Sequence, residues 1–295
     1  MRIKSRICEK QAVHEMQFKI DGQKLKDGVP LHTAVTALDN FQKIVDKSYM
    51  GITGVKKLTQ KEREKYFIKT TEIKHGSLLT NFDIVLQGVQ LGLPLFTSYG
   101  PQNIWDATKD TFNFLKTVCG AVQRGETPTY EFNNDGDASV RVGDDVHHYH
   151  GTVIQIGQAS LSNFQDLARM AGPDKLTEIS AGKIGAQESD LYIGQDDAKM
   201  FDVPTKLEQE IRTLKCEVFD FNKYKNVGKL SVSEHGQHIP VGEFSFSIFG
   251  KQSNVDYIYS MLKPEVELNC LVELEISPFG GEEIHKLHIT GIKDS

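Results

Sequence analysis

The sequence predicts an α+β protein in which two long helices cover an antiparallel sheet, followed by a small C-terminal β-barrel. Three observations support this fold class. Two strand-like runs at residues 66–86 are joined by a short glycine-containing turn. Residues 31–49 and 102–123 each carry one apolar stripe at helical spacing. Residues 216–292 contain five short strand-like runs and one helical insert.

The predicted hairpin at residues 66–86 is the element on which the first domain is built. Its first run is rich in β-branched and aromatic residues and lacks Gly and Pro, as suits a pleated, half-buried surface. His75, Gly76 and Ser77 supply the turn, in which Gly76 is free to adopt positive φ. After the turn, apolar residues alternate with Asn81 and Asp83, as expected for the second strand.

The elements around this hairpin are predicted from the spacing of apolar residues and from the Gly, Pro and Asp residues that start or end helices and strands. Residues 13–20 alternate as a strand that ends at Asp21-Gly22. Pro30 precedes the first helix, and Thr59 is placed to cap a short charged turn at residues 60–65. The helix at residues 102–123 carries the only tryptophan, Trp105.

The middle of the chain predicts a protruding polar and β-rich region at about residues 124–160. Residues 124–139 are polar and indicate a loop or hairpin, and residues 140–156 indicate β structure with a turn at Gly143-Asp144. A short helix at 163–170 and a short strand at 190–193 complete a first domain that spans residues 1–205.

The second predicted domain, residues 206–295, is a small closed or nearly closed barrel. Residues 206–214 indicate one amphipathic helix or a helical linker, and residues 254–262 indicate a helical insert ended by Pro264. Alternation predicts which side chains of one strand fill the barrel. Phe244, Phe246 and Ile248 are expected to face inward, and Ser245 and Ser247 outward.

Composition limits the function classes. The chain has 295 residues and a net charge of −6, so as a whole it offers no basic footprint for nucleic acid. Its four cysteines are Cys8, Cys119, Cys216 and Cys270, and none lies in a CxxC pair. We interpret them as buried free thiols in a reducing cytosol, and therefore expect a cytoplasmic protein. The most apolar stretch, 84–96, is too short to span a membrane, so no membrane partner is expected.

The familiar catalytic signatures are missing. The sequence holds no Walker A motif, no GxGxxG after a strand and no GxSxG elbow. We therefore predict no catalytic residue and no cofactor, and favour a non-enzymatic protein.

A first candidate site is a nucleic-acid contact on the predicted barrel. The run from Phe219 to Lys225 interleaves aromatic residues with lysines, which could stack bases and neutralise phosphates. The alternative is that the aromatic residues are ordinary strand residues and the lysines lie on a solvent-exposed loop. The candidate residues are Phe221, Lys223, Tyr224, Lys225 and Lys229.

A second candidate site is a metal centre for zinc or manganese at Asp145, His147, His148 and His150. On a strand, His147 shares a face with Tyr149, and His148 shares the other face with His150. The alternative is a solvated polar run after the Gly143-Asp144 turn.

A third candidate is the core of a metal-dependent nuclease, in which carboxylates hold Mg²⁺ beside a lysine. Glu72 and Lys74 have the Glu-x-Lys spacing, and Asp83 lies across the predicted turn. The acid that precedes such a strand is missing, because Asp46 is predicted to lie on a helix. The alternative, a solvated face of the hairpin, is the simpler interpretation.

Three segments, PLHTAVTALDNFQKIV, EIKHGSLLTNFDIVL and HIPVGEFSFSIFGK, together resemble a set of uncharacterised bacterial proteins found near antiviral-defence and mobile-element genes. The resemblance covers most of the chain and implies a cytosolic bacterial or phage protein in a defence-related assembly. It implies no catalytic residues.

Our first hypothesis is accordingly a non-enzymatic structural or interaction subunit of a prokaryotic defence-related complex, with protein partners and self-association. The alternative is a nucleic-acid-binding protein that uses the C-terminal barrel. A third hypothesis is a metal-dependent hydrolase or nuclease.

Overall fold

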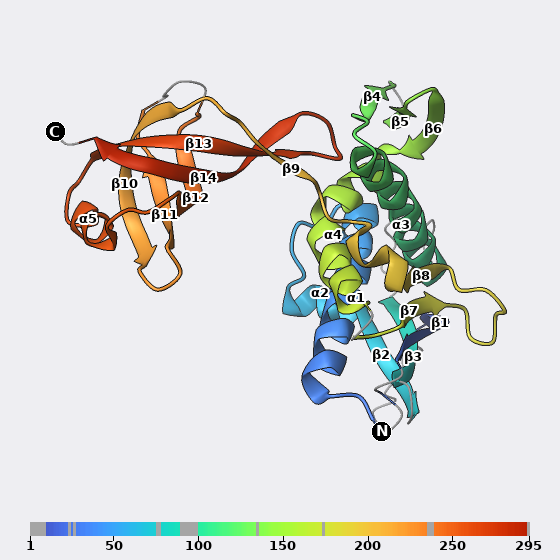
Figure 1. Cartoon of the computed structure of the whole chain (residues 1–295). Coiled ribbons are helices and arrows are strands. Elements are labelled where there is room, and N and C mark those ends of the chain that lie inside the picture. Colours follow the sequence, from blue (N-terminus) through green and yellow to red (C-terminus); the bar gives the residue numbers. More distant parts are fainter. Residues whose placement is uncertain are drawn as a thin grey trace, which may run out of the picture. The chain divides into compact units, whose positions relative to one another are not determined.

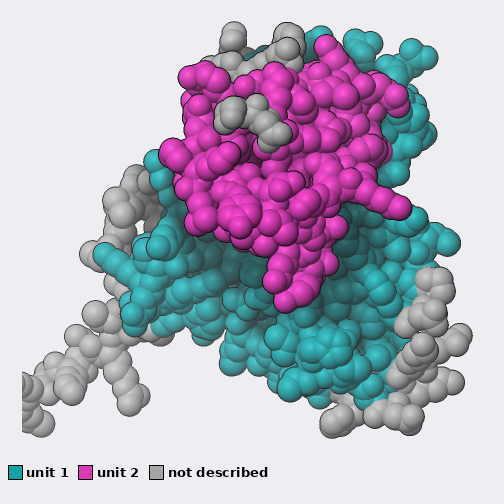
Figure 2. Space-filling view, turned by 60° about the vertical axis from the view of Figure 1, so that its left-hand side comes forward, with its two compact units in different colours: residues 1–202 teal, residues 203–295 magenta. Residues whose placement is uncertain are grey.

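The computed structural model describes residues 10–22, 25, 28–74, 78–88, 100–133, 136–172, 175–234 and 239–293 (Figure 1). The chain divides into two compact units, Met1–Asp202 and Val203–Ser295, coloured teal and magenta in Figure 2. The division falls close to the predicted boundary at residue 205.

Unit 1 contains a five-stranded antiparallel sheet with the strand order β2-β3-β1-β7-β8. Its strands are β1 (Lys10–Asp21), β2 (Tyr66–Lys74), β3 (Leu78–Gly88), β7 (Glu178–Gly182) and β8 (Leu191–Gly194). The predicted hairpin is confirmed, because β2 pairs with β3 from Tyr66↔Leu86 to Lys74↔Leu79. Its turn residues, 75–77, lie outside the described residues. Strand β7 was not predicted, because its sequence EISAG is short and has little strand propensity.

Helices α1 (Leu31–Thr53) and α3 (Pro101–Gln123) pack on the sheet through an aromatic cluster (Figure 1). The buried ring of Phe41 on α1 lies 4.5 Å from Phe18 of β1 and 6.3 Å from Trp105 of α3, measured between ring centroids. Phe82 of β3 closes the cluster at 5.7 Å from Phe41. The apolar stripes that predicted these two helices therefore meet the face of the sheet that carries Phe18 and Phe82.

The prediction of only two long helices was incomplete, and the prediction of β structure up to residue 156 was wrong. Strand β6 ends at His150, and α4 runs from Gly151 to Met170. The β-branched residues of GTVIQIG favour a strand locally, but the buried residues along α4 recur at helical spacing and pack on α1 and α3. Two glycines allow this close packing: a Cβ on Gly51 would lie 2.4 Å from Ile156, and one on Gly157 would lie 2.8 Å from Phe114.

The region predicted to protrude forms a separate three-stranded antiparallel sheet, β4-β5-β6. Its strands are β4 (Thr129–Phe132), β5 (Asp137–Val142) and β6 (Asp145–His150). Tyr149 anchors this sheet on α3, because its ring packs edge-on against Phe114 at 5.0 Å and its hydroxyl donates to Thr117 Oγ1 at 3.2 Å.

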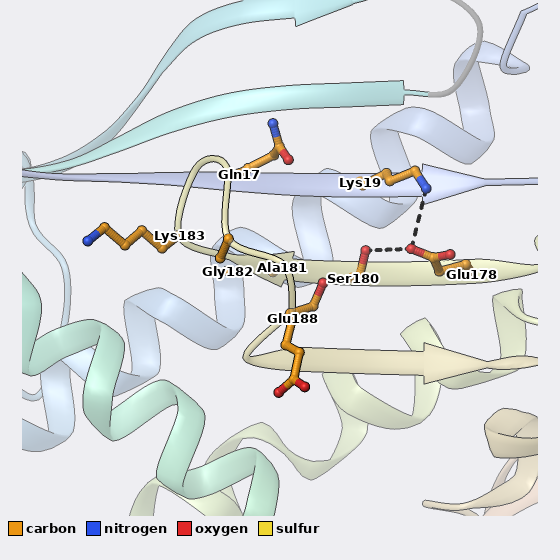
Figure 3. A pocket seen from close by; sticks show the side chains of 10 residues that line it. Gln17, Lys19, Glu178, Ser180, Ala181, Gly182, Lys183 and Glu188 are labelled. Atoms are coloured by element: carbon orange, nitrogen blue, oxygen red, sulfur yellow. Dashed lines mark hydrogen bonds and ion pairs between the residues drawn. The ribbon is translucent and has the colours of Figure 1, made fainter.

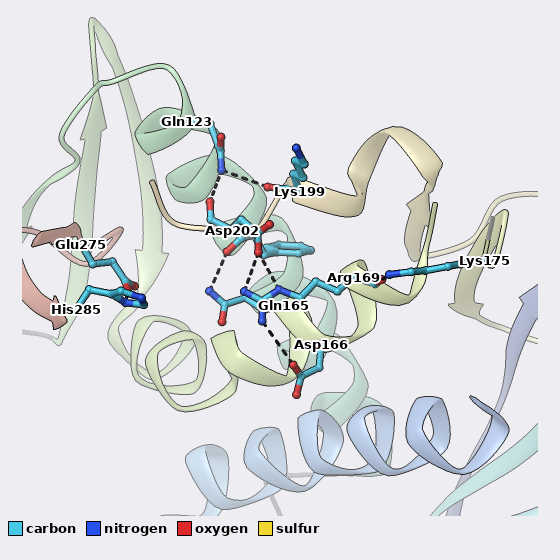
Figure 4. A network of polar contacts seen from close by, with 10 residues as sticks. Gln123, Gln165, Asp166, Arg169, Lys175, Lys199, Asp202, Glu275 and His285 are labelled. Atoms are coloured by element: carbon cyan, nitrogen blue, oxygen red, sulfur yellow. Dashed lines mark hydrogen bonds and ion pairs between the residues drawn. The ribbon is translucent and has the colours of Figure 1, made fainter. Parts of the chain in front are cut away.

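A polar network closes unit 1 at its C-terminal end (Figure 4). After the 3₁₀ helix η3 (Gln195–Lys199), the buried ring of Phe201 packs on Phe112 and Phe164. Gln165 Nε2 donates to the carbonyl of Phe201 at 3.0 Å, and Arg169 pairs with Asp202 at 2.9 Å. The last residues of unit 1 are thereby held against α3 and α4.

Unit 2 is a closed five-stranded barrel with the strand order β10-β11-β12-β14-β13, in which β13 returns to pair with β10. Its strands are β10 (Arg212–Asn222), β11 (Val227–Val232), β12 (Gly242–Ile248), β13 (Val266–Ile276) and β14 (Glu282–Lys293). Strands β12 and β14 are parallel, and α5 (Asn254–Ser260) connects β12 to β13. This five-stranded order, with the helix between the third and fourth strands, is the topology of the OB-fold.

The helix or helical linker predicted at residues 206–214 is wrong. Residues Thr205–Leu207 form β9, which pairs with β13, and β10 already begins at Arg212. The first half of β10 pairs with β13, from Arg212↔Cys270 to Cys216↔Val266, and its second half pairs with β11. The partner that makes this segment a strand is distant in sequence, so local periodicity could not reveal it.

The inward and outward alternation predicted for β12 is confirmed. Phe246 is fully buried and Phe244 and Ile248 pack against the core, whereas Ser245 is exposed. The thiols of Cys119, Cys216 and Cys270 are free and buried, and burial raises their pKa values to about 12, 12 and 11. Cys8 lies outside the described residues. Within the described part of the chain, no helix combines the length and apolarity needed to cross a membrane.

Candidate nucleic-acid interface

The turn between β10 and β11, residues 223–226, presents one aromatic ring and two lysines to solvent. Tyr224 is 87% exposed, which is the highest exposure among the large hydrophobic side chains of the described chain. Lys223 and Lys225 flank it and are also exposed. The Nζ of Lys223 lies 5.1 Å from the centroid of the Tyr224 ring, within the range of a cation–π contact.

Hydrogen bonds hold this turn in one conformation. Asn222 Oδ1 accepts from the backbone N–H groups of Tyr224 at 3.1 Å and Lys225 at 3.2 Å. Asn226 takes the left-handed conformation with φ 55°, which asparagine tolerates well. Asn254 of α5 donates from Nδ2 to the carbonyl of Lys223 at 2.9 Å. A ligand of this turn would therefore meet side chains on a pre-ordered backbone, which lowers the entropic cost of binding.

A second connection beside this turn adds another ring and another lysine. The N–H of Ile248 donates to the carbonyl of Asn226 at 3.0 Å, so the residues that follow β12 lie next to the turn. Among them, Phe249 is 48% exposed and Lys251 is exposed. The sequence contained both residues in the string IFGK, but only the barrel topology brings the end of β12 next to Asn226 of the turn. The Phe249 ring itself lies edge-on to His288 of β14, with centroids 6.2 Å apart.

We call this region the basic end of the barrel. It comprises Phe219, Lys223, Tyr224, Lys225, Lys229, Phe249 and Lys251. Phe219 is 40% exposed at a β-bulge between Val218 and Asp220. Lys229 is exposed on β11, where Asp220 is its cross-strand partner.

Phe221, the other aromatic candidate, is half-buried and packs against the core beneath the turn. Its ring stacks at 6.0 Å on the buried Phe246 and lies 5.4 Å from Tyr257 of α5. Phe221 therefore supports the turn from within, and the exposed aromatic surface is supplied by Tyr224, Phe249 and Phe219.

The β13–β14 hairpin carries the opposite charge. Glu275 faces Glu283 across the two strands, and Glu282 is adjacent. His285 Nδ1 lies 2.8 Å from Glu275 Oε2. This hairpin extends beyond the segment of β13 that pairs with β10, away from the β10–β11 turn (Figure 1). Glu275, Glu282 and Glu283 thus form an acidic group on this hairpin, separate from the lysines of the β10–β11 turn.

A polar row crosses the outer face of the barrel. Ser247 Oγ lies 3.0 Å from His288 Nδ1, His288 Nε2 lies 2.7 Å from Glu273 Oε2, and Thr205 Oγ1 donates to Glu273 at 2.6 Å. Although this order of groups matches a Ser-His-acid triad, Ser247 lies within a regular strand, whereas nucleophilic serines lie on sharp turns beside free amides. We interpret the row as cross-strand pairing.

The candidate metal residues separate onto two faces of β6. His147 and Tyr149 face inward, with ring centroids 6.3 Å apart, and His148 and His150 face outward. His148 contacts Ser139 at 3.1 Å, and His150 contacts Asp137 at 2.6 Å, beside a hollow of about 340 Å³. Asp145 is exposed at the start of the strand. Among the described residues, no group of three or more His, Cys, Asp or Glu side chains is placed to hold a metal ion.

The nuclease candidates are also apart. Asp83 pairs across the sheet with Lys69, whereas Glu72 pairs with Asn81 and accepts a hydrogen bond from its Nδ2 at 2.9 Å. Asp46 is buried in an ion pair with Arg63.

A hollow of about 200 Å³ lies on the sheet of unit 1 beside β1 and β7 (Figure 3). Two of its charged groups, Lys19 and Glu178, neutralise one another at 3.5 Å, and Lys19 also lies 3.0 Å from Asp21. Ser180 Oγ also donates to Glu178 at 2.9 Å. The hollow is polar but offers no uncompensated charge at Lys19 or Glu178 for a ligand.

No protein-family model matches the chain, and neither a curated protein nor a solved structure matches it.

Proposed function

We propose that this chain binds single-stranded nucleic acid through the basic end of its C-terminal barrel. The observation that carries the proposal is the turn at residues 223–226. Its fixed backbone presents the exposed ring of Tyr224 between two exposed lysines. Topology supports part of this surface, because OB-folds bind oligonucleotides with the loops between strands one and two and between strands four and five. The first of these is the lysine-bearing β10–β11 turn, whereas the second is the acidic β13–β14 hairpin.

The chemistry of a single strand fits this surface. Unpaired bases expose π-faces that stack on aromatic rings, and each stacked base contributes roughly 1–3 kcal/mol. Tyr224 and Phe249 are the most exposed rings of the basic end, and Lys223, Lys225 and Lys251 can neutralise phosphates. Side chains of this kind recognise the backbone and the base faces, so we expect little sequence preference.

The overall charge of −6 does not by itself oppose the proposal, because Glu275, Glu282 and Glu283 lie on the β13–β14 hairpin and not on the β10–β11 turn. A strand bound at the basic end lies away from these glutamates. Salt screens the remaining repulsion over a length of about 8–10 Å.

The first test reverses charge at the turn. Replacing Lys223 and Lys225 by Glu should weaken binding of a fluorescent single-stranded oligonucleotide, measured by anisotropy over a range of salt concentrations. The slope of log K against log salt should become shallower by about 0.7 for each phosphate that the variant no longer neutralises.

A matched double variant makes the same change of charge at another place on the barrel. Replacing Lys206 and Lys286 by Glu alters β9 and the start of β14, near the acidic hairpin. This variant should bind nearly as the wild type does. Equal reductions of affinity in the two double variants, or binding that ignores salt, would contradict the proposal.

Tyr224 provides the test of stacking. Because its side chain is 87% exposed, Tyr224→Ala should leave the stability of the barrel unchanged. Its affinity for the oligonucleotide should fall about tenfold, corresponding to roughly 1.4 kcal/mol of stacking free energy. Tyr224→Phe should retain the affinity, since the ring remains.

The hypothesis of a structural or interaction subunit in a prokaryotic defence-related complex stays a prediction. One observation favours a protein contact: a cluster of exposed apolar side chains on α5. A subunit that binds nucleic acid and also associates with protein would satisfy both hypotheses.

A further inference from the structure

Helix α5 carries an apolar stripe that faces solvent. Residues 255, 258, 259 and 262 recur at i, i+3, i+4 and i+7, which places them on one side of a helix. The α-helix ends at Ser260 and the chain continues as a tighter turn, in which the N–H of Leu262 donates to the carbonyl of Tyr259 at 3.0 Å and that of Lys263 to the carbonyl of Ser260 at 3.1 Å. The exposed fractions of the four side chains are 53% for Val255, 41% for Ile258, 62% for Tyr259 and 79% for Leu262.

This stripe is the second apolar side of α5. The first side faces the barrel, where Tyr257 is buried and its hydroxyl donates to Gln252 Oε1 at 2.6 Å. A surface helix in a monomer usually needs only one such side. A contiguous apolar surface on the other side is typical of a protein contact.

The charges beside the stripe indicate which partner fits. Asp256 and Lys263 are seven residues apart, about two helical turns, so they border the same flank at opposite ends of the stripe. Within the described part of the chain, neither makes an ion pair. A partner for this surface needs an apolar stripe flanked by a cation and an anion in the reverse order.

A second copy of α5 has that arrangement. When two copies meet antiparallel about a two-fold axis perpendicular to both helices, each stripe covers the other. Asp256 of each copy then lies against Lys263 of the other, and this charge pair is formed twice. The apolar stripe and its two flanking charges are therefore complementary to those of a second copy.

We propose that two copies of this chain associate through antiparallel packing of α5 on α5. The interface is small, because one short helix per copy contributes to it, so the dimer is weak and dissociates on dilution. The proposal does not depend on nucleic-acid binding.

The first experiment measures the mass of the full chain by sedimentation velocity over a range of protein concentrations. The wild type should shift from monomer to dimer as concentration rises. Leu262→Glu should raise the dissociation constant by at least roughly tenfold, because it places two charges in the apolar interface. Leu31→Glu on α1 is the matched control, since Leu31 is also 79% exposed, and it should dimerise like the wild type.

The second experiment tests the charge pairing. Asp256→Lys alone and Lys263→Asp alone should each weaken self-association, because like charges then meet twice. An equimolar mixture of the two variants should associate again, since every meeting pair is then opposite in charge. Recovery in the mixture also shows that each variant is folded.

A wild type that stays monomeric throughout would overturn the proposal. So would a dimer that survives Leu262→Glu, or one that is disrupted equally by Leu31→Glu. A mixture of the charge variants that stays monomeric while the wild type dimerises would overturn the antiparallel arrangement.

Discussion

Gly228, on β11, lies where two parts of the barrel come closest. A Cβ at this position would lie 2.2 Å from the carbonyl oxygen of Asp220 and 2.6 Å from the ring of Phe246. The first neighbour is the backbone at the β-bulge of β10, and the second is part of the aromatic core. Neither can move without disturbing the turn that carries Tyr224.

Gly228→Ala should therefore lower the free energy of unfolding of the barrel by about 1–3 kcal/mol, the usual cost of overpacking. Urea unfolding followed by circular dichroism measures this decrease. Trp105, the only tryptophan, lies in unit 1, and its fluorescence should report an unchanged transition.

Gly291 is the control for this substitution. It lies in β14, and nothing is within 4 Å of an added Cβ. Gly291→Ala should leave the barrel at least as stable as the wild type. Equal decreases for the two alanines would show that close packing at Gly228 is not the cause.

At the scale of elements, a polar network joins α1, α2 (Gln60–Lys65) and β2. The guanidinium of Arg63 on α2 binds both oxygens of the buried Asp46, at 2.9 and 2.5 Å. Tyr66 donates to Asp46 at 2.9 Å, and its ring stacks on Tyr49 with centroids 4.0 Å apart. The predicted cap is present as well, because Thr59 Oγ1 accepts from the N–H of Glu62.

The two tyrosines of this network make unit 1 sensitive to alkali. Burial, together with Glu62, raises the pKa of Tyr49 from 10.0 to about 12, and burial together with Asp46 raises that of Tyr66 well above 10.0. A raised tyrosine pKa means that the fold favours the neutral phenol. This stabilisation is complete below pH 10, where the unfolded chain titrates, and is lost as the pH rises through the folded pKa.

We therefore expect the stability of unit 1 to fall steeply between about pH 10 and 12. Trp105 fluorescence during urea unfolding at each pH measures the fall. Tyr49→Phe removes one titrating group and should flatten the curve. Tyr224→Phe, at an exposed site in the other unit, should leave the curve unchanged.

The elements also show how far local pattern predicts structure. Local sequence predicted the β2–β3 hairpin, α1 and α3. Each has regularly spaced apolar residues and residues at its ends that terminate a strand or helix. Helix α4 was missed because Val153, Ile154 and Ile156 favour a strand locally, while packing on α1 and α3 imposes a helix. The candidate site was predicted in part: Lys223, Tyr224 and Lys225 lie on one turn, whereas only the barrel topology brings the end of β12, which precedes Phe249 and Lys251, next to Asn226.

At the scale of the whole molecule, each unit has its own core. In unit 2 the core lines the inside of the closed barrel, and Leu268, Phe246 and Leu287 are fully buried there. The last residues of unit 1 are the buried Phe201 and Asp202, which forms an ion pair with Arg169. The division between Asp202 and Val203 therefore separates two complete cores.

We expect residues 1–202 and 203–295, produced separately, each to unfold cooperatively with urea. Residues 1–200 provide the sharper comparison, because they lack Phe201 and Asp202. Removal of the buried phenylalanine should lower the free energy of unfolding by about 3–5 kcal/mol relative to residues 1–202. An unfolded 203–295 fragment would show that the barrel depends on unit 1.

The sequence by itself determined the α+β class, the organising hairpin, the late β-rich domain and the lysine-aromatic turn. These features depend on neighbours in the chain, whose spacing can be seen directly. Only the tertiary structure decided that residues 212–216 close the barrel against β13, that Phe221 packs on the core, and that the end of β12 lies next to Asn226. It also showed that Val255 and Leu262 face solvent although their spacing suits a core. Burial and pairing depend on partners distant in sequence, and the pattern of one segment does not specify them.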